Sequence, residues 1–332
     1  MTYTNHPLLI TGTPVAISIY TTSQEQPHYH EGFLEIIYCL KGSAKIHISY
    51  EEIQLEEGDI ISCDHHDIHA LHSSEDNLFV SFYFDLADPV FKNPDLQHFF
   101  FVCERYVLRK EKQEQLQNLK HYLLTLLYFY CFPDSKVSQE ETFCYLAGKI
   151  IDIMVEHFHF FDYAVNALDY SDEAKKRFER IMVYTDQHYQ EKLTIEKISK
   201  KEHLNANYLS QSFKKTTFLR YSSFLHFLRV YYSELLLLNT DKTISEISYE
   251  VGFSDPKFYY RFFKIWYGHT PLAHKKYLRE IARKASENRY YSVSEIPATL
   301  EHYIALYFAT LHVPEYWNVP YVPYRNIPFE KK

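Results

Sequence analysis

The most constraining feature of this 332-residue chain is an internal repeat in its second half. Residues 193–215 (LTIEKISKKEHLNANYLSQSFKK) and 242–264 (KTISEISYEVGFSDPKFYYRFFK) align at an offset of 49 positions before a turn and 50 positions after it. In each copy a short amphipathic stretch, a tight turn and a second amphipathic stretch follow one another. The repeat predicts two helix-turn-helix units, 193–216 and 242–266, joined by a helix over 223–239 that is apolar on one side.

Residue types at the turns support this prediction. Gly252 suits the positive φ that a sharp turn between helices needs, and Asn205 and Ser254 or Asp255 suit the position that caps a helix. If the apolar residues of each second helix face inward, polar side chains face solvent. Amides of Asn and Gln can pair with adenine, Arg can pair with guanine, and Lys can neutralise phosphate. The predicted DNA-contacting residues are therefore Asn207, Ser210, Gln211, Lys214, Lys257, Tyr260, Arg261 and Lys264.

The charge distribution agrees with one nucleic-acid-binding segment in an otherwise acidic protein. Residues 1–170 carry 10 Lys and Arg against 25 Asp and Glu, whereas residues 171–283 carry 20 against 13. A basic segment of this kind is expected to meet a polyanion. The positive charge of residues 171–283 disfavours another interpretation, in which this segment is an adaptor that binds a protein partner.

The second unit resembles a known family. SEISYEVGFSDPKFYYRFFKIWYGHTP is similar to the second helix-turn-helix of AraC/XylS-type transcription regulators, and the first unit agrees through YLSQSFKK and Arg229. The chain departs from the family pattern at Ser199 and Ser248, where alanine is usual, at Phe218 and Tyr259, and at His274-Lys275, where Tyr-Arg is usual. The resemblance covers about 100 residues and implies a double-stranded DNA partner, a homodimer, and RNA polymerase as a candidate partner.

The first 90 residues read as short alternating strands, among them PVAISIYT, FLEIIYCL, SAKIHISY and NLFVSFYF, which are typical of a sandwich or barrel. The motif His28-x-His30-x4-Glu35-x6-Gly42, followed by Gly58 and His69, is similar to cupin sensor domains, although the second motif lacks its proline and glycine. Three imidazoles and a carboxylate suit Fe, Mn, Ni or Zn, so His28, His30, Glu35 and His69 are metal candidates. The same residues could instead line an effector pocket, or the histidines could have a purely structural role.

The resemblance favours the effector pocket. Both tryptophans lie outside the strands, so stacking on an effector would fall to Phe33, Tyr38, Phe82 or Tyr83. Tyr38 joins His28, His30, Glu35 and His69 in the predicted effector-binding set. The resemblance implies a sugar or sugar derivative as effector, and no metal or other cofactor is expected. The competing hypothesis is a cupin metalloenzyme with an accessory helical domain.

The rest of the chain completes the predicted organisation. Two helices over 112–130 and 139–159 carry leucine-rich stripes that suit either a core-facing position or a dimer seam. Five cysteines without metal-binding spacing, and the lack of a leader or a long apolar stretch, predict a cytoplasmic protein without a membrane span. The expected fold class is α+β and multidomain: a cupin-like barrel (1–90), a helical dimerisation or linker part (91–170), an all-α double helix-turn-helix domain (171–283), and a C-terminal helix and tail (284–332). The expected function is that of an effector-responsive DNA-binding regulator, not an enzyme.

Overall fold

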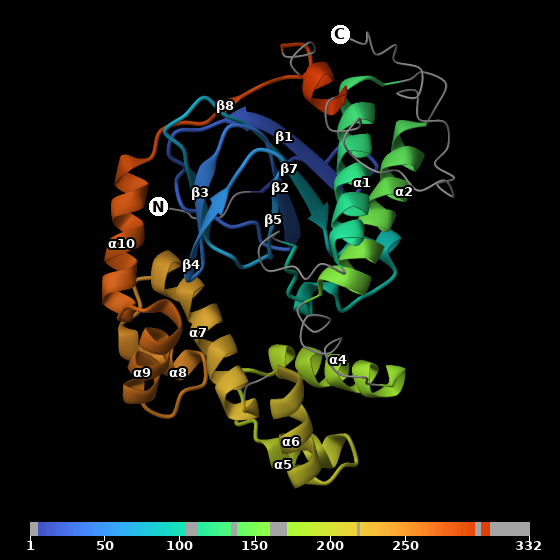
Figure 1. Ribbon diagram of the computed structural model, residues 1–332. Helices are drawn as coiled ribbons and strands as arrows, with labels where there is room; N and C mark the ends of the chain where they lie inside the picture. Colours follow the sequence, from blue (N-terminus) through green and yellow to red (C-terminus); the bar gives the residue numbers. More distant parts are fainter. Residues whose placement is uncertain are drawn as a thin grey trace.

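A computed structural model describes residues 6–103, 112–133, 138–159, 171–217, 220–295 and 300–305. Two antiparallel sheets form the N-terminal part (Figure 1). One sheet has the order β5-β2-β7-β1-β8 and the other the order β4-β3-β6. The strands are β1 (Val15–Thr21), β2 (Phe33–Lys41), β3 (Ala44–Ile48), β4 (Glu51–Leu55), β5 (Ile60–Cys63), β6 (His69–His72), β7 (Leu78–Asp85) and β8 (Arg289–Tyr290). The β-rich region expected from the sequence is confirmed.

Strand alternation divides the side chains of β2 between two cores. Ile37 and Cys39 pack into the interior between the two sheets, together with residues such as Ile46 and Leu71. Residues on the other face of β2, such as Ile36, pack outward against helices. Because successive side chains of a strand point to opposite faces, Glu35 shares the interior face with Ile37 and Cys39.

Helices α1 (Gln113–Cys131) and α2 (Gln139–Ile153) cover the outer face of the five-stranded sheet (Figure 1). Short 3₁₀ helices η1 (Pro89–Phe91) and η2 (Leu96–His98) precede them, and a π-helical turn η4 (Met154–Phe158) ends α2. The leucine stripe of α1 is buried within the chain's own core. Of the two positions that the sequence left open for this stripe, the structure therefore uses the core-facing one.

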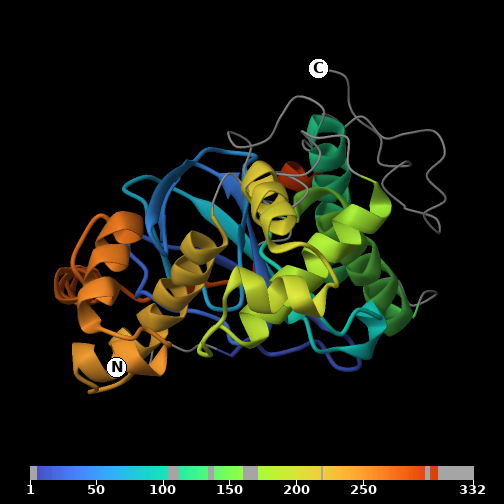
Figure 2. The same ribbon diagram turned by 90° about the horizontal axis from the view of Figure 1, so that it is seen from below.

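The helical part begins with α4 (Asp172–Gln187) and forms two helix-turn-helix units, which lie below the barrel in Figure 1 and are seen from that side in Figure 2. The first unit comprises α5 (Ile195–Lys201) and α6 (Ala206–Thr217), and the second comprises α8 (Ile244–Glu250) and α9 (Pro256–Tyr267). Helix α7 (Tyr221–Asn239) connects them, and α10 (Pro271–Lys284) follows. Asn205 and Asp255 cap α6 and α9 by accepting backbone N–H bonds, as expected from their residue types.

The two turns use left-handed backbone conformations. Gly252 has φ +94° and His203, at the equivalent position of the first unit, has φ +54°. A Cβ atom at Gly252 would lie 2.5 Å from the carbonyl oxygen of Gln190, in the loop before α5. Gly252 thus permits both the turn and the close approach of the second unit to that loop.

Gly252→Ala is expected to lower the free energy of unfolding by at least about 2 kcal/mol, because left-handed backbone strain and an overpacked contact add together. Urea unfolding followed by circular dichroism measures this loss. Gly148→Ala is the matched control, because a Cβ at Gly148 in α2 meets no atom within 4 Å. Equal stability of the two variants would contradict the proposed packing role.

The helical part contacts the N-terminal part at several places, on both sides of α7. Near the first unit, Asp186 of α4 accepts hydrogen bonds from His98 of η2 and Tyr232 of α7, both at 2.7 Å. Near the second unit, Leu238 and Leu278 pack against Tyr29 and Ile68 of the barrel. The ring of Tyr50, in the turn between β3 and β4, also contacts Phe227 of α7 and Tyr267 of α9. Contacts along the length of α7 therefore set its position relative to the sheets.

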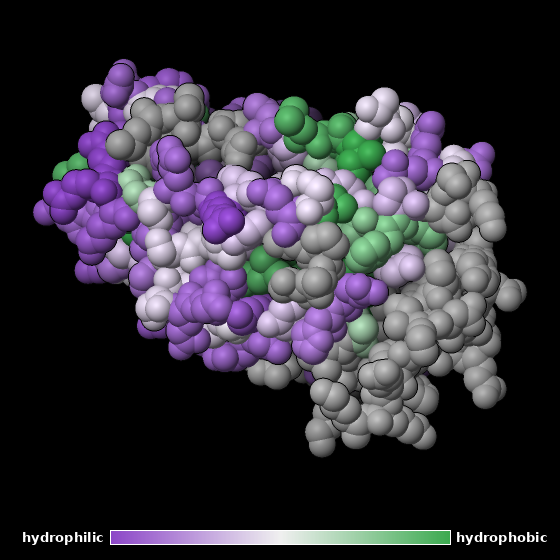
Figure 3. Space-filling model, turned by 90° about the horizontal axis from the view of Figure 1, so that it is seen from above, coloured by the Kyte–Doolittle hydropathy of each residue, from purple (hydrophilic) through white to green (hydrophobic). Residues whose placement is uncertain are grey.

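The surface carries no broad apolar face on the side drawn in Figure 3, where hydrophobic residues gather in small patches among hydrophilic ones. Within the described ranges, no helix is long and apolar enough to cross a membrane.

Candidate functional site

Four side chains from three segments meet inside the barrel. His28 and His30 precede β2, Glu35 lies on β2, and His69 begins β6; one ligand atom from each lies within 4.8 Å of the others. Backbone hydrogen bonds between His28 and His69, in both directions, tie the two histidine-bearing segments together. The structure therefore brings together all four residues that the cupin-like motif singled out.

The hydrogen bonds of the histidines orient the cluster. Nδ1 of His28 bonds to the carbonyl of Gln26 and Nδ1 of His69 to the carbonyl of Asp67, each at 2.9 Å. These contacts leave Nε2 of His69 to face Oε2 of Glu35 at 2.9 Å, and Nε2 of His30 lies 3.2 Å from the same oxygen. Oε2 of Glu35 thus lies close to the Nε2 atoms of two imidazoles, and His30, Glu35 and His69 are almost closed to solvent.

Burial and charges within the cluster shift the pKa values of Glu35, His69 and His28. Burial would raise the pKa of Glu35, but His30 and His69 outweigh it and hold that pKa well below its usual value. Burial would lower the pKa of His69, but Glu35 raises it to about 9. For His28, burial and the neighbouring charges of His69 and His30 lower the pKa to about 3. The cluster at neutral pH therefore contains a buried ion pair beside a neutral imidazole.

The donor set fits a divalent metal ion. Metal bonds to His nitrogen and carboxylate oxygen are about 2.0–2.2 Å long, so ligand atoms on opposite sides of an ion lie roughly 4.4 Å apart. The spread of 4.8 Å needs only a small contraction. The carbonyl bonds to Nδ1 of His28 and His69 are also the contacts that commonly orient metal-binding imidazoles.

Two other residues lie around the cluster: Tyr83, one of the aromatic residues that the sequence offered for stacking, and Glu25, which was not predicted. Tyr83 lies opposite Glu35 in the β2–β7 pair, and its ring is 4.8 Å from that of His30. Glu25 is buried beside β6, where it accepts a backbone hydrogen bond from Leu71. The alternation of β7 would have placed Tyr83 on the inner face, but no local pattern marks Glu25.

The prediction that Tyr38 lines this site is wrong. Tyr38 is three positions from Glu35, and an odd separation along a strand directs the two side chains to opposite faces. The Tyr38 ring is fully buried in the core that β2 shares with α1 and α2. Tyr83 supplies the aromatic ring on the cluster's side of the sheet.

The predicted DNA-contacting residues lie on exposed faces of α6 and α9. Their inward neighbours Leu209 and Phe213 of α6, and Tyr259 and Phe263 of α9, are buried, which fixes the orientation of both helices. Exposed aromatic rings of Tyr208 and Phe258 stand beside this face and were not predicted. All eight predicted residues are exposed: Asn207, Ser210, Gln211 and Lys214 on α6, and Lys257, Tyr260, Arg261 and Lys264 on α9.

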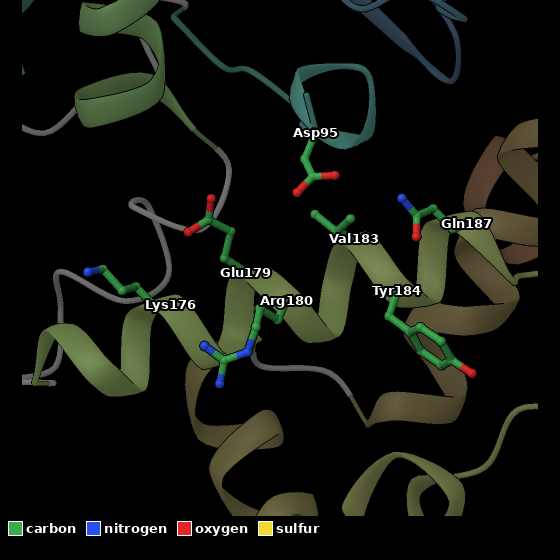
Figure 4. A pocket seen from close by; sticks show the side chains of 7 residues that line it. All are labelled: Asp95, Lys176, Glu179, Arg180, Val183, Tyr184 and Gln187. Carbon is green, nitrogen blue, oxygen red and sulfur yellow. The ribbon is translucent and has the colours of Figure 1, made fainter. Parts of the chain in front are cut away.

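A separate open pocket lies between α4 and the loop before η2 (Figure 4). Its volume is about 470 Å³, and charges of both signs line it. Arg180 at its rim is already engaged by Glu202 at 3.1 Å. The lining residues are Asp95, Lys176, Glu179, Arg180, Val183, Tyr184 and Gln187.

A histidine at the contact between barrel and α10 predicts a pH effect. The ring of His47 lies 5.2 Å from that of Tyr277 and 6.2 Å from that of His274, and neither ring nitrogen has a hydrogen-bond partner among the residues that the structure describes. Burial lowers the pKa of His47 to about 4. The titratable groups that face it are Glu234, His274, Glu52, His269 and Tyr277.

Acidification is therefore expected to weaken this contact. A histidine whose pKa is depressed in the native state contributes its full stability above its ordinary pKa of about 6.5, and that stability is lost as pH falls toward 4. The loss for His47 reaches about 3 kcal/mol over this window. Urea unfolding at pH 7.5 and 4.5 tests this: His47→Leu should lose less stability than wild type or the exposed control His6→Leu. An equal loss in all three would contradict it.

Comparisons with known proteins match both halves of the chain. A model of the helix-turn-helix domain matches residues 198–277, and a model of the cupin domain matches residues 19–83. The uncharacterized HTH-type transcriptional regulator YdeC of Bacillus subtilis is 25% identical over 75% of this chain and 85% of its own length. The uncharacterized HTH-type transcriptional regulator SAR0107 of Staphylococcus aureus is 22% identical over 73% of this chain, which spans only 31% of that relative.

Solved structures of similar proteins include complete and partial chains. ToxT of Vibrio cholerae aligns over 81% of this chain and 98% of its own, with a TM-score of 0.41 and 14% identity. The C-terminal domain of the two-component response regulator yesN of Fusobacterium nucleatum aligns over 31% of this chain and 99% of its own, with a TM-score of 0.28 and 30% identity.

Proposed function

We propose that this chain is an AraC/XylS-type transcriptional regulator that binds specific DNA sequences, and that its cupin barrel senses an effector and thereby controls how the two helix-turn-helix units meet DNA. The observation that carries the proposal is the presence of two polar, exposed recognition faces on α6 and α9, joined by one helix, α7. Such a pair suits two successive major-groove contacts about 34 Å apart. The barrel then serves regulation instead of catalysis.

The proposal assigns a role to each part. Residues 1–90 hold the effector among His28, His30, Glu35 and His69, and residues 171–283 hold the DNA. The effector is a small polar molecule, with a sugar as the first class to test, because carboxylate, imidazole and phenol groups converge on the cluster. We further propose that the active species is a homodimer that contacts RNA polymerase.

The test begins with DNA upstream of the chain's own gene, in gel-shift titrations with unrelated DNA as competitor. A shift that resists competitor supports specific binding. Arg261→Ala is expected to weaken binding by about 1–3 kcal/mol and to relax selection at one base pair, because arginine pairs with guanine through two hydrogen bonds. Arg279→Ala removes the same charge from an exposed position of α10 and is the matched control. Equal weakening on all DNA sequences would contradict base reading by Arg261.

The convergence of four ligand atoms favours a second candidate, in which the barrel holds a divalent metal as its regulatory ligand or, alternatively, as the centre of a cupin metalloenzyme. His28, His30, Glu35 and His69 would hold the ion, which would supply a Lewis acid beside Tyr83. Elemental analysis of chelator-free protein, with thermal shifts on adding Fe²⁺, Mn²⁺, Ni²⁺ or Zn²⁺, decides this candidate. Absence of metal together with unchanged melting temperatures would reject it.

A further inference from the structure

The chain returns to the barrel after its last DNA-binding helix. Residues 286–291, here called the C-terminal clasp, leave the end of α10 and run along the edge of the five-stranded sheet (Figure 1). Within the clasp, β8 pairs with β1 through Tyr290 opposite Tyr20. Backbone N–H groups of Ser286 and Tyr291 donate to the carbonyls of Gln24 and Ile19, at 2.9 and 2.8 Å. The clasp is thus a strand of the barrel supplied by the opposite end of the chain.

One side chain of the clasp reaches the surroundings of the buried cluster. The amide nitrogen of Asn288 donates to Oε1 of Glu25 at 2.8 Å, while Oε2 of Glu25 accepts from the Leu71 backbone. Glu25 is buried and close enough to His69 and Glu35 for their charges to act on its pKa, which burial raises. Asn288 therefore joins the C-terminus to a carboxylate that neighbours the candidate effector site.

Tyr290 extends the same contact to strand β1 of the barrel. Its ring lies 5.7 Å from that of Tyr20, whose hydroxyl is 3.2 Å from that of Ser81. Tyr290 remains 57% exposed, whereas Tyr20 beneath it is buried. Burial raises the pKa of Tyr290, and the charges of Glu25 and Glu35 add to the rise. The clasp consequently covers the edge of the barrel that lies beside the His–Glu cluster.

The helix at the other end of the clasp is held by the second helix-turn-helix unit. His274 of α10 bonds to Glu234 of α7 at 2.6 Å, and Tyr267 at the end of α9 bonds to the same carboxylate at 2.7 Å. Side chains on α10 also meet the barrel, since Tyr277 donates to Glu52 at 3.0 Å. A displacement of α10 would therefore move α7 and α9 with it.

Residues next to the cluster contact the same helices. Tyr29 stands between His28 and His30 and accepts a hydrogen bond from Asn239 at the end of α7, at 3.3 Å. Ile68 precedes His69 and packs with Leu278 of α10. Because side chains alternate along extended segments, Tyr29 and Ile68 face the side opposite the neighbouring histidines, where they contact α7 and α10.

We propose that the C-terminal clasp is a gate of the barrel site and that its position is coupled to that of the second helix-turn-helix unit. The coupling rests on the proposed function, whereas the gate stands on the contacts of Asn288 and Tyr290 alone. Entry of an effector opens the Asn288–Glu25 contact, and the released clasp lets α10 move together with α7 and the second unit relative to the barrel.

A reversible cross-link tests the gate in the full-length protein. The hydroxyls of Ser23 and Ser286 lie 2.6 Å apart, so Ser23→Cys together with Ser286→Cys should form a disulfide that locks the clasp. The same protein under reducing conditions is its own control. Diethyl pyrocarbonate modification of His28 and His30, measured by peptide mass spectrometry, reports access to the cluster, with exposed His269 as the reference. The locked form is expected to react at least about tenfold more slowly at the cluster.

A point substitution opens the gate without a cross-link. Asn288→Ala removes a hydrogen bond to a carboxylate and is expected to speed cluster modification roughly ten- to a hundredfold. Glu287→Ala, an exposed neighbour in the same clasp, should react as wild type does. Equal cluster modification rates for oxidised and reduced protein, with Asn288→Ala indistinguishable from Glu287→Ala, would overturn the gate.

DNA affinity measures the coupling between the clasp and the second helix-turn-helix unit. Locking the clasp should change the gel-shift affinity for the selected DNA by roughly 5- to 150-fold, the usual range of coupling between two sites. Oxidised wild-type protein controls for the five native cysteines, of which four are buried. Identical affinities of the locked and reduced forms would overturn the coupling. If even wild-type protein binds no DNA selectively, the proposed function fails, and histidine modification still decides the gate.

Discussion

Replacing His274 by alanine is expected to lower the free energy of unfolding of the DNA-binding part by about 3–5 kcal/mol, because it leaves a buried carboxylate without its main partner. His274 and Glu234 are each only 1% exposed, and the bond between them is 2.6 Å long. Tyr267 would remain as the one donor that the structure shows for Glu234 among the described residues. Urea unfolding monitored by tryptophan fluorescence measures the loss, since Trp266 lies in α9.

Two further variants separate the effect on stability of breaking the buried His274–Glu234 pair from the effect of shortening a side chain. Lys276→Ala, at an exposed position of α10, should change stability by less than about 0.5 kcal/mol. The double variant Glu234→Leu with His274→Leu should be more stable than His274→Ala, because it removes the buried charge together with its partner. If His274→Ala were as stable as Lys276→Ala, the proposed role of the pair would be rejected. The pair also accounts for His274 at a position where AraC/XylS-type regulators usually have tyrosine.

Glu35→Ala is expected to cost a similar amount, about 3–5 kcal/mol, in the barrel. The substitution leaves the imidazoles of His30 and His69 in a buried site without the carboxylate oxygen that both approach. Thermal unfolding of metal-free protein followed by circular dichroism gives the change. Glu31→Ala removes the same charge from an exposed position four residues earlier and should be nearly neutral.

The comparison of Glu35→Ala with Glu31→Ala shows whether Glu35 stabilises the barrel or behaves as an exposed surface charge does. A loss confined to Glu35→Ala supports a buried cluster that the barrel maintains without a ligand. Such a cluster is costly to build, and its members are then available to a metal ion or a polar effector. A loss no larger than that of Glu31→Ala would mean that the ion pair of Glu35 and His69 contributes nothing to the fold.

Local patterns were sufficient for the elements that carry the proposed function. The 49- and 50-residue offsets of the repeat predicted both helix-turn-helix units, because each unit is a short segment whose turn, cap and apolar spacing lie within about 25 residues. The alternation of 33–40 correctly placed Glu35 on the face of Ile37 and Cys39. The same rule, applied to Tyr38, would have excluded that residue from the site.

Contacts between distant segments were not predictable in the same way. Asn288 lies 263 positions from Glu25, and the pattern around Asn288 is that of an irregular connection. The pairing of β8 with β1 depends on where α10 ends relative to the barrel, which no local periodicity encodes. The apolar stripe of α1 was equally compatible with the chain's own core and with a dimer interface, because an apolar helix face predicts burial but not the surface that covers it.

The sequence by itself therefore determined the two halves of the protein: a β-rich sensor-like part with His28, His30, Glu35 and His69, and a double helix-turn-helix part with polar faces on both second helices. Local turn chemistry, alternation and helical spacing are properties of neighbouring residues, so the sequence displays them directly. Only the tertiary structure decided that the C-terminus closes back on the barrel through Asn288 and that Glu234 binds His274 inside the second unit. Those contacts join segments far apart in the chain, and they form only when packing of the larger elements has brought the segments together.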